Sequence, residues 1–162
     1  MKQRPGLILV SHGSLLCGAD KAVNEHAARL RKSGDFHSVR IGFLNYSNPS
    51  FGEALAAIMV EGATEVILVP YFLVPGRFAR AVISDALAHY SNIAAGIVIR
   101  IANPIGYEPL LVEAVLQLVE STGDTESRTS AISESLLACA TNPKCPLVGL
   151  SGCKARSEDA AQ

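Results

Sequence analysis

The sequence predicts a doubly wound α/β domain, in which a four-stranded parallel sheet carries helices on both faces. Nearly continuous apolar runs, such as "LILVS" at residues 7–11 and "EVILVPYFL" at residues 65–73, are typical of parallel strands that are buried on both faces. Amphipathic segments long enough for crossover helices separate these runs. Strand and helix therefore alternate four times over residues 1–121, which is the pattern of an α/β fold.

Each expected strand is either a continuous apolar run or an alternation of apolar and other residues. In the second strand Val39, Ile41 and Phe43 alternate with Arg40 and Gly42. The four strands are expected at residues 7–11, 39–43, 65–73 and 96–102.

Apolar residues three and four positions apart predict the helices between these strands. In the first helix Val23, Ala27 and Leu30 share one face. The helices are expected at residues 20–32, from Ser50 to Gly62, from the turn at 74–77 to about Tyr90, and from about Tyr107 to Val119.

The composition favours a compact protein and excludes several kinds of partner. The chain has 162 residues, of which 49% are hydrophobic and 18% charged, and its net charge is −1. So small a charge provides no basic field for nucleic acid or for a membrane surface. No apolar stretch approaches the roughly 20 residues of a membrane span, and the first apolar run is too short for a signal peptide. We therefore expect a cytoplasmic protein whose cysteines stay reduced.

Residues 122–162 are expected to form three successive segments. The first, "TGDTESRTS", has the composition of a polar linker. A short helix is expected at "AISESLLACA", and a cysteine-containing tail follows it. Cys139, Cys145 and Cys153 lie in this segment. Reduced thiolates can hold a metal ion or an iron–sulfur cluster, with a fourth ligand from Cys17 or from a dimer mate. The spacing matches no standard cluster motif, so incidental cysteines are the alternative.

Ligands of doubly wound folds bind beyond the carboxyl ends of the strands. Here these ends carry "SHGS", "NYSNPS", "YFLVPGR" and "NPIGY". His12 is the leading candidate, because a neutral imidazole can bind a metal ion or accept a proton and Gly13 leaves room for a ligand. The alternative is a histidine that only bonds a neighbouring backbone carbonyl.

The other histidines have structural interpretations. His26 shares a helix face with apolar residues and is expected to be a partly buried core residue. His37 is expected to be exposed at a strand start, and His89 to complement the dipole at a helix end.

The segment after the first strand contains neither a phosphate-binding loop nor the G-x-S-x-G motif of a nucleophilic serine. "GSLLCG" has the spacing of neither the G-x-G-x-x-G motif nor the P-loop. A hydrolase using Ser11 or Ser14 with His12 is a remote alternative, because adjacent residues of a strand point to opposite faces.

Four segments in order resemble the CbiX/SirB family of sirohydrochlorin chelatases, which insert cobalt or ferrous iron into a modified tetrapyrrole. The resemblance covers about residues 6 to 121. The segments are "LILVSHGS", "VRIGFLNYSNPSFGEAL", "GATEVILVPYFLVPGRF" and "NPIGYEPLLVEAV".

The resemblance implies roles for several residues. His12 matches the metal-binding histidine of the family and would hold the incoming divalent ion or take a proton from a pyrrole nitrogen. Ser14 and Tyr71 would contact the macrocycle, and Arg77 and Arg80 would bind its carboxylates. Arg77 can equally be read as a plain surface residue.

Two positions depart from the family pattern. Phe78 stands where the family shows the second histidine of a G-x-H pattern, and Asn45 stands where many members carry a glutamate. Asn45 could coordinate a metal only weakly and cannot act as a base. Phe78 would either stack on the macrocycle with Tyr71 or pack in the core.

The resulting hypothesis is a chelatase that inserts Co²⁺ or Fe²⁺ into sirohydrochlorin for cobalamin or sirohaem synthesis. The alternative is a non-catalytic tetrapyrrole- or metal-binding protein derived from the same fold. Short members of the family that have one such domain imply a homodimer.

Overall fold

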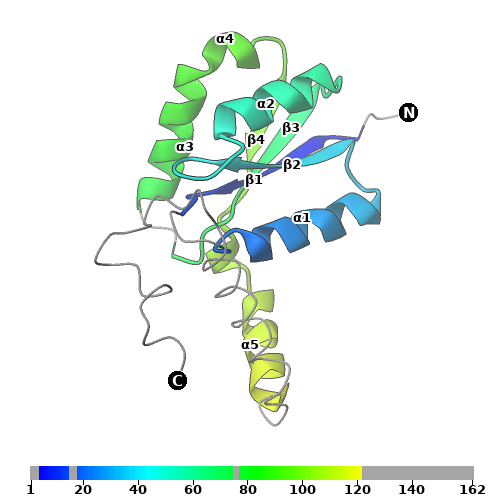
Figure 1. The fold of residues 1–162 in the computed structure, drawn as a ribbon, viewed down its shortest axis with the longest axis vertical. Helices are drawn as coiled ribbons and strands as arrows, with labels where there is room; N and C mark the ends of the chain where they lie inside the picture. The colour runs from blue at the N-terminus through cyan, green and yellow to red at the C-terminus, as the bar shows by residue number, and fades with distance from the viewer. Residues whose placement is uncertain (1–3, 15–17, 75–76, 122–162) are drawn as a thin grey trace, which may run out of the picture. The chain divides into compact units, whose positions relative to one another are not determined.

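In the computed structural model of the chain, residues 4–14, 18–74 and 77–121 are described (Figure 1), with the backbone alone at 77–80, 82 and 93. These residues divide into two compact units. The larger contains residues 4–13 and 21–108, and the smaller contains residues 14, 18–20 and 109–121. The predicted linker, the short helix after it, Cys17 and the three cysteines of the tail lie outside the described residues.

A four-stranded, all-parallel sheet forms the larger unit, and the predicted fold class is confirmed. Its strands lie in the order β2-β1-β3-β4. The strands are β1 (Gly6–Ser11), β2 (Ser38–Phe43), β3 (Glu65–Pro70) and β4 (Val98–Ile101).

Helices connect the strands of this unit, and a further helix follows in the smaller unit. The connecting elements are α1 (Lys21–Ser33), α2 (Phe51–Val60), α3 (Arg77–His89) and α4 (Ser91–Ala94). A 3₁₀ turn, η1 (Ile105–Tyr107), follows β4, and the smaller unit contains α5 (Leu110–Glu120). None of the helices in the described part of the chain has the length and apolar character needed to cross a membrane.

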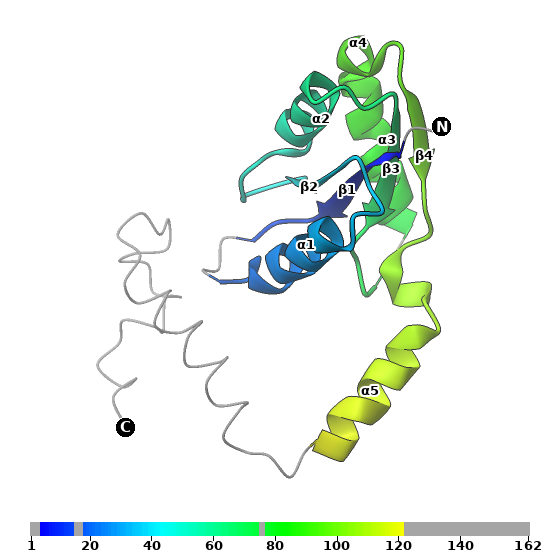
Figure 2. The ribbon, with the colours of Figure 1, turned by 90° about the vertical axis from the view of Figure 1, so that its right-hand side faces the viewer.

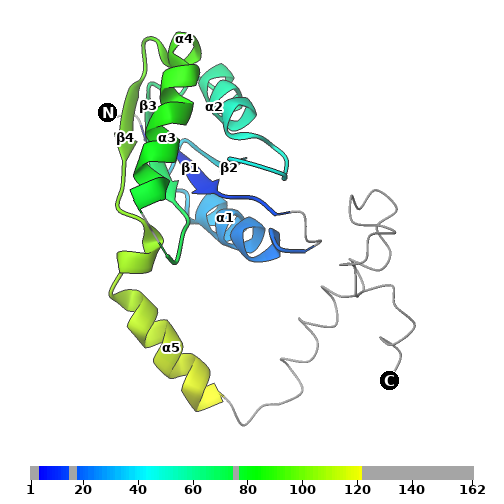
Figure 3. The ribbon, with the colours of Figure 1, turned by 90° about the vertical axis from the view of Figure 1, so that its left-hand side faces the viewer.

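The strand order explains why both faces of the sheet carry helices. Crossovers between parallel strands are right-handed. The chain steps in one direction from β1 to β2 and in the opposite direction from β2 to β3 and from β3 to β4. Figures 1 and 2 accordingly show α1 on one side of the sheet and α2 on the other, and Figure 3 shows α3 alongside β3 and β4.

Two apolar clusters hold these layers together. On one face, Leu55 and Ile58 of α2 and Ile83 of α3 pack against alternate residues of β1 and β3. On the other face, Val23 and Ala27 of α1 pack against the intervening residues of β1 and against β2. Burial of such side chains is the main favourable term in folding.

The strands differ in how completely their two faces are covered. All four residues from Leu7 to Val10 of β1 are buried, as the continuous apolar run predicts. Residues of β3 alternate between buried and half-buried, and Val98 of β4 is exposed. Among the described residues of this unit, α1 lies over β1 and β2, so Ile67 and Val69 of β3 are only partly covered.

The third strand is shorter than predicted, because its last residues bond to a turn instead of a strand. Tyr71 still donates its N–H to the Val10 carbonyl at 2.7 Å. The Phe72 carbonyl accepts a hydrogen bond from Gly106 of η1 at 2.9 Å. Residues 71–73, which the apolar run assigns to the strand, therefore leave the sheet.

The last helix starts later than predicted, and proline explains the difference. Residues from Ile105 to Tyr107 form the 3₁₀ turn, and Glu108 is extended with ψ 120°. Proline at position 109 disfavours the helical conformation of the residue before it, so α5 begins only at Leu110.

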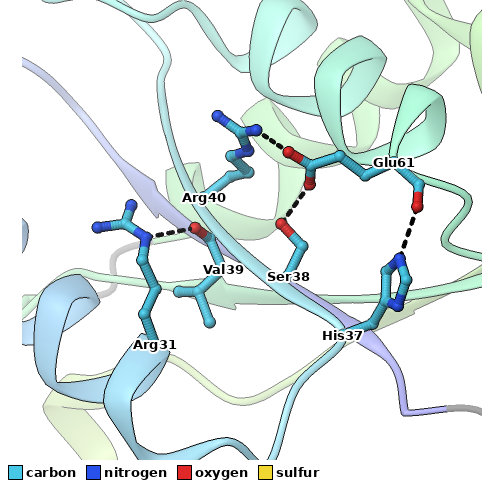
Figure 4. Close-up of polar contacts among 6 residues, drawn as sticks. All are labelled: Arg31, His37, Ser38, Val39, Arg40 and Glu61. Carbon is cyan, nitrogen blue, oxygen red and sulfur yellow. Dashed lines mark hydrogen bonds and ion pairs between the residues drawn. The ribbon is translucent and has the colours of Figure 1, made fainter.

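A polar cluster ties the end of α2 to the edge strand β2 (Figure 4). The Glu61 carboxylate accepts hydrogen bonds from the Ser38 hydroxyl and the Arg40 guanidinium. His37, exposed as predicted, donates from Nε2 to the Glu61 carbonyl at 2.7 Å. Arg31 of α1 donates from Nε to the Val39 carbonyl at 2.9 Å, so both neighbouring helices are bonded to this strand.

The start of α2 is fixed by a capping box between Ser50 and Glu53. The Ser50 hydroxyl accepts from the Glu53 N–H, and the Glu53 carboxylate accepts from the Ser50 backbone N–H at 2.7 Å. The pKa of the Glu53 carboxyl lies below its usual value of 4.5. The hydrogen bond from the Ser50 backbone N–H is the main cause, and the bond from the Ser50 hydroxyl is the second.

We predict that the capping box makes stability depend on pH in the acid range. The pKa of Glu53 is lower in the folded protein than in the unfolded chain. The stabilisation that its carboxylate provides is therefore complete at pH values above the unfolded pKa and is lost as the pH falls through the folded pKa. Glu53→Gln keeps an acceptor for the Ser50 N–H but does not titrate. Urea unfolding between about pH 6 and pH 3 should show a larger loss of stability in the wild type than in Glu53→Gln. Parallel pH dependences in the two proteins would contradict this assignment.

Candidate functional site

The candidate site lies at the carboxyl edge of the sheet, where the order of the strands reverses. The chain leaves β1 toward β2 on one side, and β3 lies on the other side of β1. Such a switch point is where doubly wound folds bind ligands. His12 directly follows β1, Asn45 follows β2 after Leu44, and Tyr71 directly follows β3.

His12 is exposed at this edge, and its backbone hydrogen bond determines its tautomer. Nδ1 lies 3.1 Å from the Gly13 carbonyl oxygen. A carbonyl oxygen can only accept, so Nδ1 carries the proton in this bond. In the neutral ring the lone pair is then on Nε2, where it can bind a metal ion or accept a proton. The backbone bond expected under the structural alternative is therefore present, and the role of His12 toward a metal ion or a proton remains a prediction.

Two loops continue the pairing of β1 and β2 beyond the ends of the strands. Leu44 donates its N–H to the Ser11 carbonyl and Asn45 donates to the His12 carbonyl, both at 2.9 Å. A Cβ atom at Gly13 would lie 1.8 Å from the Asn45 carbonyl oxygen, and Gly13 has φ +82°. Only glycine fits this contact, which holds the His12 loop against the loop after β2.

Asn45 contributes its backbone to the site. Its N–H bonds the His12 carbonyl, while its side chain is exposed. It lies on the loop that adjoins His12, and its weak coordination of a metal remains a prediction.

Tyr46, which the sequence interpretation did not single out, lies beside His12. The two ring centres are 6.0 Å apart and the rings are tilted by 48°. The signal available in the sequence was an aromatic residue within the polar segment "NYSNPS" next to Asn45.

Tyr71 lies on the α1 side of the sheet, where its ring packs against the cluster formed by α1, β1 and β2. Its hydroxyl is 2.5 Å from Nδ1 of His26, and burial raises the pKa of the hydroxyl. The prediction that His26 is a core residue is wrong, because its side chain is exposed and reaches this hydroxyl instead. Sequence periodicity placed His26 on the apolar face but could not reveal a partner 45 residues away.

A mostly apolar groove of about 430 Å³ adjoins this pair on the α1 face. Tyr71 and His26 form part of its wall. The other lining residues are Leu7, Leu9, Arg29, Leu30, Phe36, Val69 and Ile105.

For the remaining predicted site residues, the structure describes the backbone but few contacts of the side chains. Arg77 and Phe78 begin α3 at the carboxyl edge of the sheet, and their side chains, like that of Arg80, lie outside the described part of the structure. Ser14 follows Gly13 and starts the smaller unit. Their roles therefore remain predictions.

The described residues bring no complete set of metal ligands together. No three side chains of His, Cys, Asp or Glu in that part of the chain form a group able to hold a metal ion.

The candidate site thus consists of an exposed histidine at the switch point of a doubly wound α/β fold, where such folds bind ligands. A family model described as CbiX matches residues 6–122. The chain belongs to the CbiX family, and the resemblance seen in the sequence is confirmed.

Curated proteins similar to this chain are named as sirohydrochlorin chelatases. The chloroplastic sirohydrochlorin ferrochelatase of Arabidopsis thaliana is 26% identical over 142 residues, which cover 88% of this chain and 62% of the relative. The sirohydrochlorin cobaltochelatase of Sulfolobus acidocaldarius is 30% identical over 121 residues, which cover 75% of this chain and 94% of the relative.

The structural comparison agrees with these matches. The sirohydrochlorin chelatase SirB from Bacillus subtilis subspecies spizizenii, solved in complex with cobalt, aligns with a TM-score of 0.61 and 26% identity. The alignment covers 74% of this chain and 51% of SirB. The chain therefore spans less than two thirds of the length of the plant relative and about half of SirB.

We predict that Gly13→Ala destabilises the protein more than a glycine substitution at a similar φ without a steric clash. Gly96 has φ +90°, and a methyl group added there would meet nothing within 4 Å. Gly96→Ala therefore measures the conformational cost alone, about 1–2 kcal/mol. Gly13→Ala adds the clash with the Asn45 carbonyl and should lower the free energy of unfolding further. Equal losses in urea unfolding would show that the two loops do not meet as described.

Proposed function

We propose that this chain is a sirohydrochlorin chelatase, which inserts a divalent metal ion, Co²⁺ or Fe²⁺, into the tetrapyrrole for cobalamin or sirohaem synthesis. The observation that carries the proposal is the exposed His12, whose Nδ1–H is bonded to the Gly13 carbonyl, which leaves the lone pair of the neutral ring on Nε2. Membership of the CbiX family and the activities for which its relatives are named support this substrate class.

The chemistry assigned to His12 is proton transfer coupled to metal entry. Insertion of a divalent ion displaces two protons from the nitrogens of the macrocycle, so a base at the site lowers the barrier. Nε2 would accept one such proton or hold the incoming ion until the pyrrole nitrogens replace the protein ligand. Because His12 is exposed, the proton can pass from the imidazolium to solvent.

The same proposal includes a homodimer in the cytoplasm. The assembly rests on the resemblance of this chain to the short members of the family. A metal ion or an iron–sulfur cluster on Cys139, Cys145 and Cys153 remains a prediction from the residue pattern alone.

We expect His12→Ala to abolish catalysed insertion of metal into sirohydrochlorin. General acid–base catalysis by one side chain contributes about 10²- to 10⁴-fold, so the catalysed rate should fall by at least about 100-fold. The measurement is anaerobic insertion followed by absorbance, with Fe²⁺, Co²⁺ and Ni²⁺ in turn.

His89→Ala is the matched control for this experiment. His89 is exposed and ends α3, which runs from the carboxyl edge of the sheet back to the amino edge. Its substitution should leave insertion unchanged. A His12→Ala protein as active as the wild type would contradict the assigned role.

A tetrapyrrole- or metal-binding protein without insertion activity is the second candidate function. It is favoured by the lack of any three-residue metal-ligand group within the described ranges. Asn45 and Phe78 also stand where the family pattern expects ligands.

Phe78→His separates the two functions. If the chain is a chelatase weakened by the loss of a ligand, the variant should insert metal faster than the wild type, whereas a carrier should gain metal affinity alone. Phe78→Gln is the control, since it supplies a polar side chain close to histidine in size without an imidazole. Insertion rates and metal affinities that are both the same in the wild type and both variants would show that position 78 takes no part in metal binding or transfer.

A further inference from the structure

The loop between β2 and α2 contains a strained turn centred on an aromatic residue. Tyr46 has φ +60°, which bulky residues adopt rarely. Ser47 donates its N–H to the Asn45 carbonyl at 2.6 Å, so Tyr46 is the central residue of a γ-turn with positive φ, the uncommon and strained form. Glycine and asparagine take this conformation more readily than tyrosine does.

Hydrogen bonds on both sides hold the strained residue in place. Before the turn, the Asn45 N–H bonds the His12 carbonyl at 2.9 Å. After the turn, the Phe43 N–H bonds the Pro49 carbonyl at 3.0 Å, and the Ser50 cap starts α2. Strain of this kind persists where the surroundings impose it, and it is concentrated at ligand sites.

The tyrosine ring of this turn lies outside the core and beside His12. Tyr46 is 66% exposed, so its ring does not stabilise the protein by burial. Its ring centre lies 6.0 Å from that of His12, at a tilt of 48°. A flat ligand that meets His12 at its edge or centre is therefore within reach of the tyrosine ring.

We propose that Tyr46 is a substrate-positioning residue whose ring packs against the planar conjugated ligand while His12 acts on it. This proposal rests on the proposed chelatase function and deepens it. Aromatic rings attract one another when their centres are 4.5–7 Å apart in offset or tilted arrangements. Because backbone hydrogen bonds on both sides hold the turn, only the side-chain torsions of Tyr46 need to be ordered when a ligand covers its ring. Tyr46 would thus orient the macrocycle so that its nitrogens face Nε2 of His12.

Three substitutions separate the ring, the hydroxyl and the backbone turn. Tyr46→Phe keeps the ring, whereas Tyr46→Asn and Tyr46→Gly remove it and still permit positive φ. Metal-free sirohydrochlorin is titrated into each full-length protein and followed by absorbance, and metal insertion is measured in parallel. Urea unfolding reports the stability of each variant.

We expect Tyr46→Asn and Tyr46→Gly to bind the tetrapyrrole about tenfold more weakly than the wild type, with KM rising more than kcat falls. Tyr46→Phe should bind as the wild type does. Neither Tyr46→Asn nor Tyr46→Gly should be less stable than the wild type, because the strain at position 46 is relieved.

Three results would overturn the proposal, and they are distinguishable. Wild-type affinity in Tyr46→Gly would exclude a role for the ring, while the chelatase function would stand. Weak binding by Tyr46→Phe would place the effect on the hydroxyl instead of the ring. A wild-type protein that neither binds nor metallates sirohydrochlorin would overturn the proposed function together with this inference.

Discussion

The double burial of β1 is the constraint on which the rest of this structure depends. The strand pairs with β2 along one edge and with β3 along the other, and residues from Leu7 to Val10 are at most 3% exposed. Both apolar clusters use it, one through Ile8 and Val10 and the other through Leu7 and Leu9. A strand held on four sides cannot shift its register without exposing one of these sets. His12, the next residue but one after Val10, therefore emerges at a fixed place on the carboxyl edge.

The chemistry of the site comes from backbone groups as much as from side chains. The Gly13 carbonyl selects the tautomer of His12, and the Asn45 N–H holds the carbonyl of the same histidine. Hydrogen bonds of this kind orient an imidazole and leave its other nitrogen free for a ligand. Among the described residues, His12 belongs to no group of three His, Cys, Asp or Glu side chains that could hold a metal ion. In the proposed function this suits transfer, because an ion held by few protein ligands passes readily to the four nitrogens of a macrocycle.

The two tyrosines at this edge have different surroundings and, by inference, different roles. Tyr71 is partly buried, bonded to His26 and packed beside the groove on the α1 face. Tyr46 is exposed and supported by a strained turn next to His12. The exposed ring is the one that a ligand at His12 would cover, whereas the hydroxyl of Tyr71 already has a partner.

The sequence by itself determined the fold class, the order of the main elements and the position of His12. Apolar runs and helical spacing are local properties, and they are sufficient where burial is continuous, as from residue 7 to residue 10. The family resemblance also predicted which metal-ligating residue types to expect at positions 45 and 78, where this chain has Asn45 and Phe78 instead.

Only the tertiary structure decided which residues surround His12. The end of β3 at Pro70 depends on a bond from Gly106, the exposure of His26 depends on Tyr71, and the place of Tyr46 depends on the contact between Gly13 and the Asn45 carbonyl. Each of these contacts joins residues more than 30 positions apart. Periodicity reports how a segment faces the core, but it contains no information about which distant backbone groups will meet, and those meetings build the site.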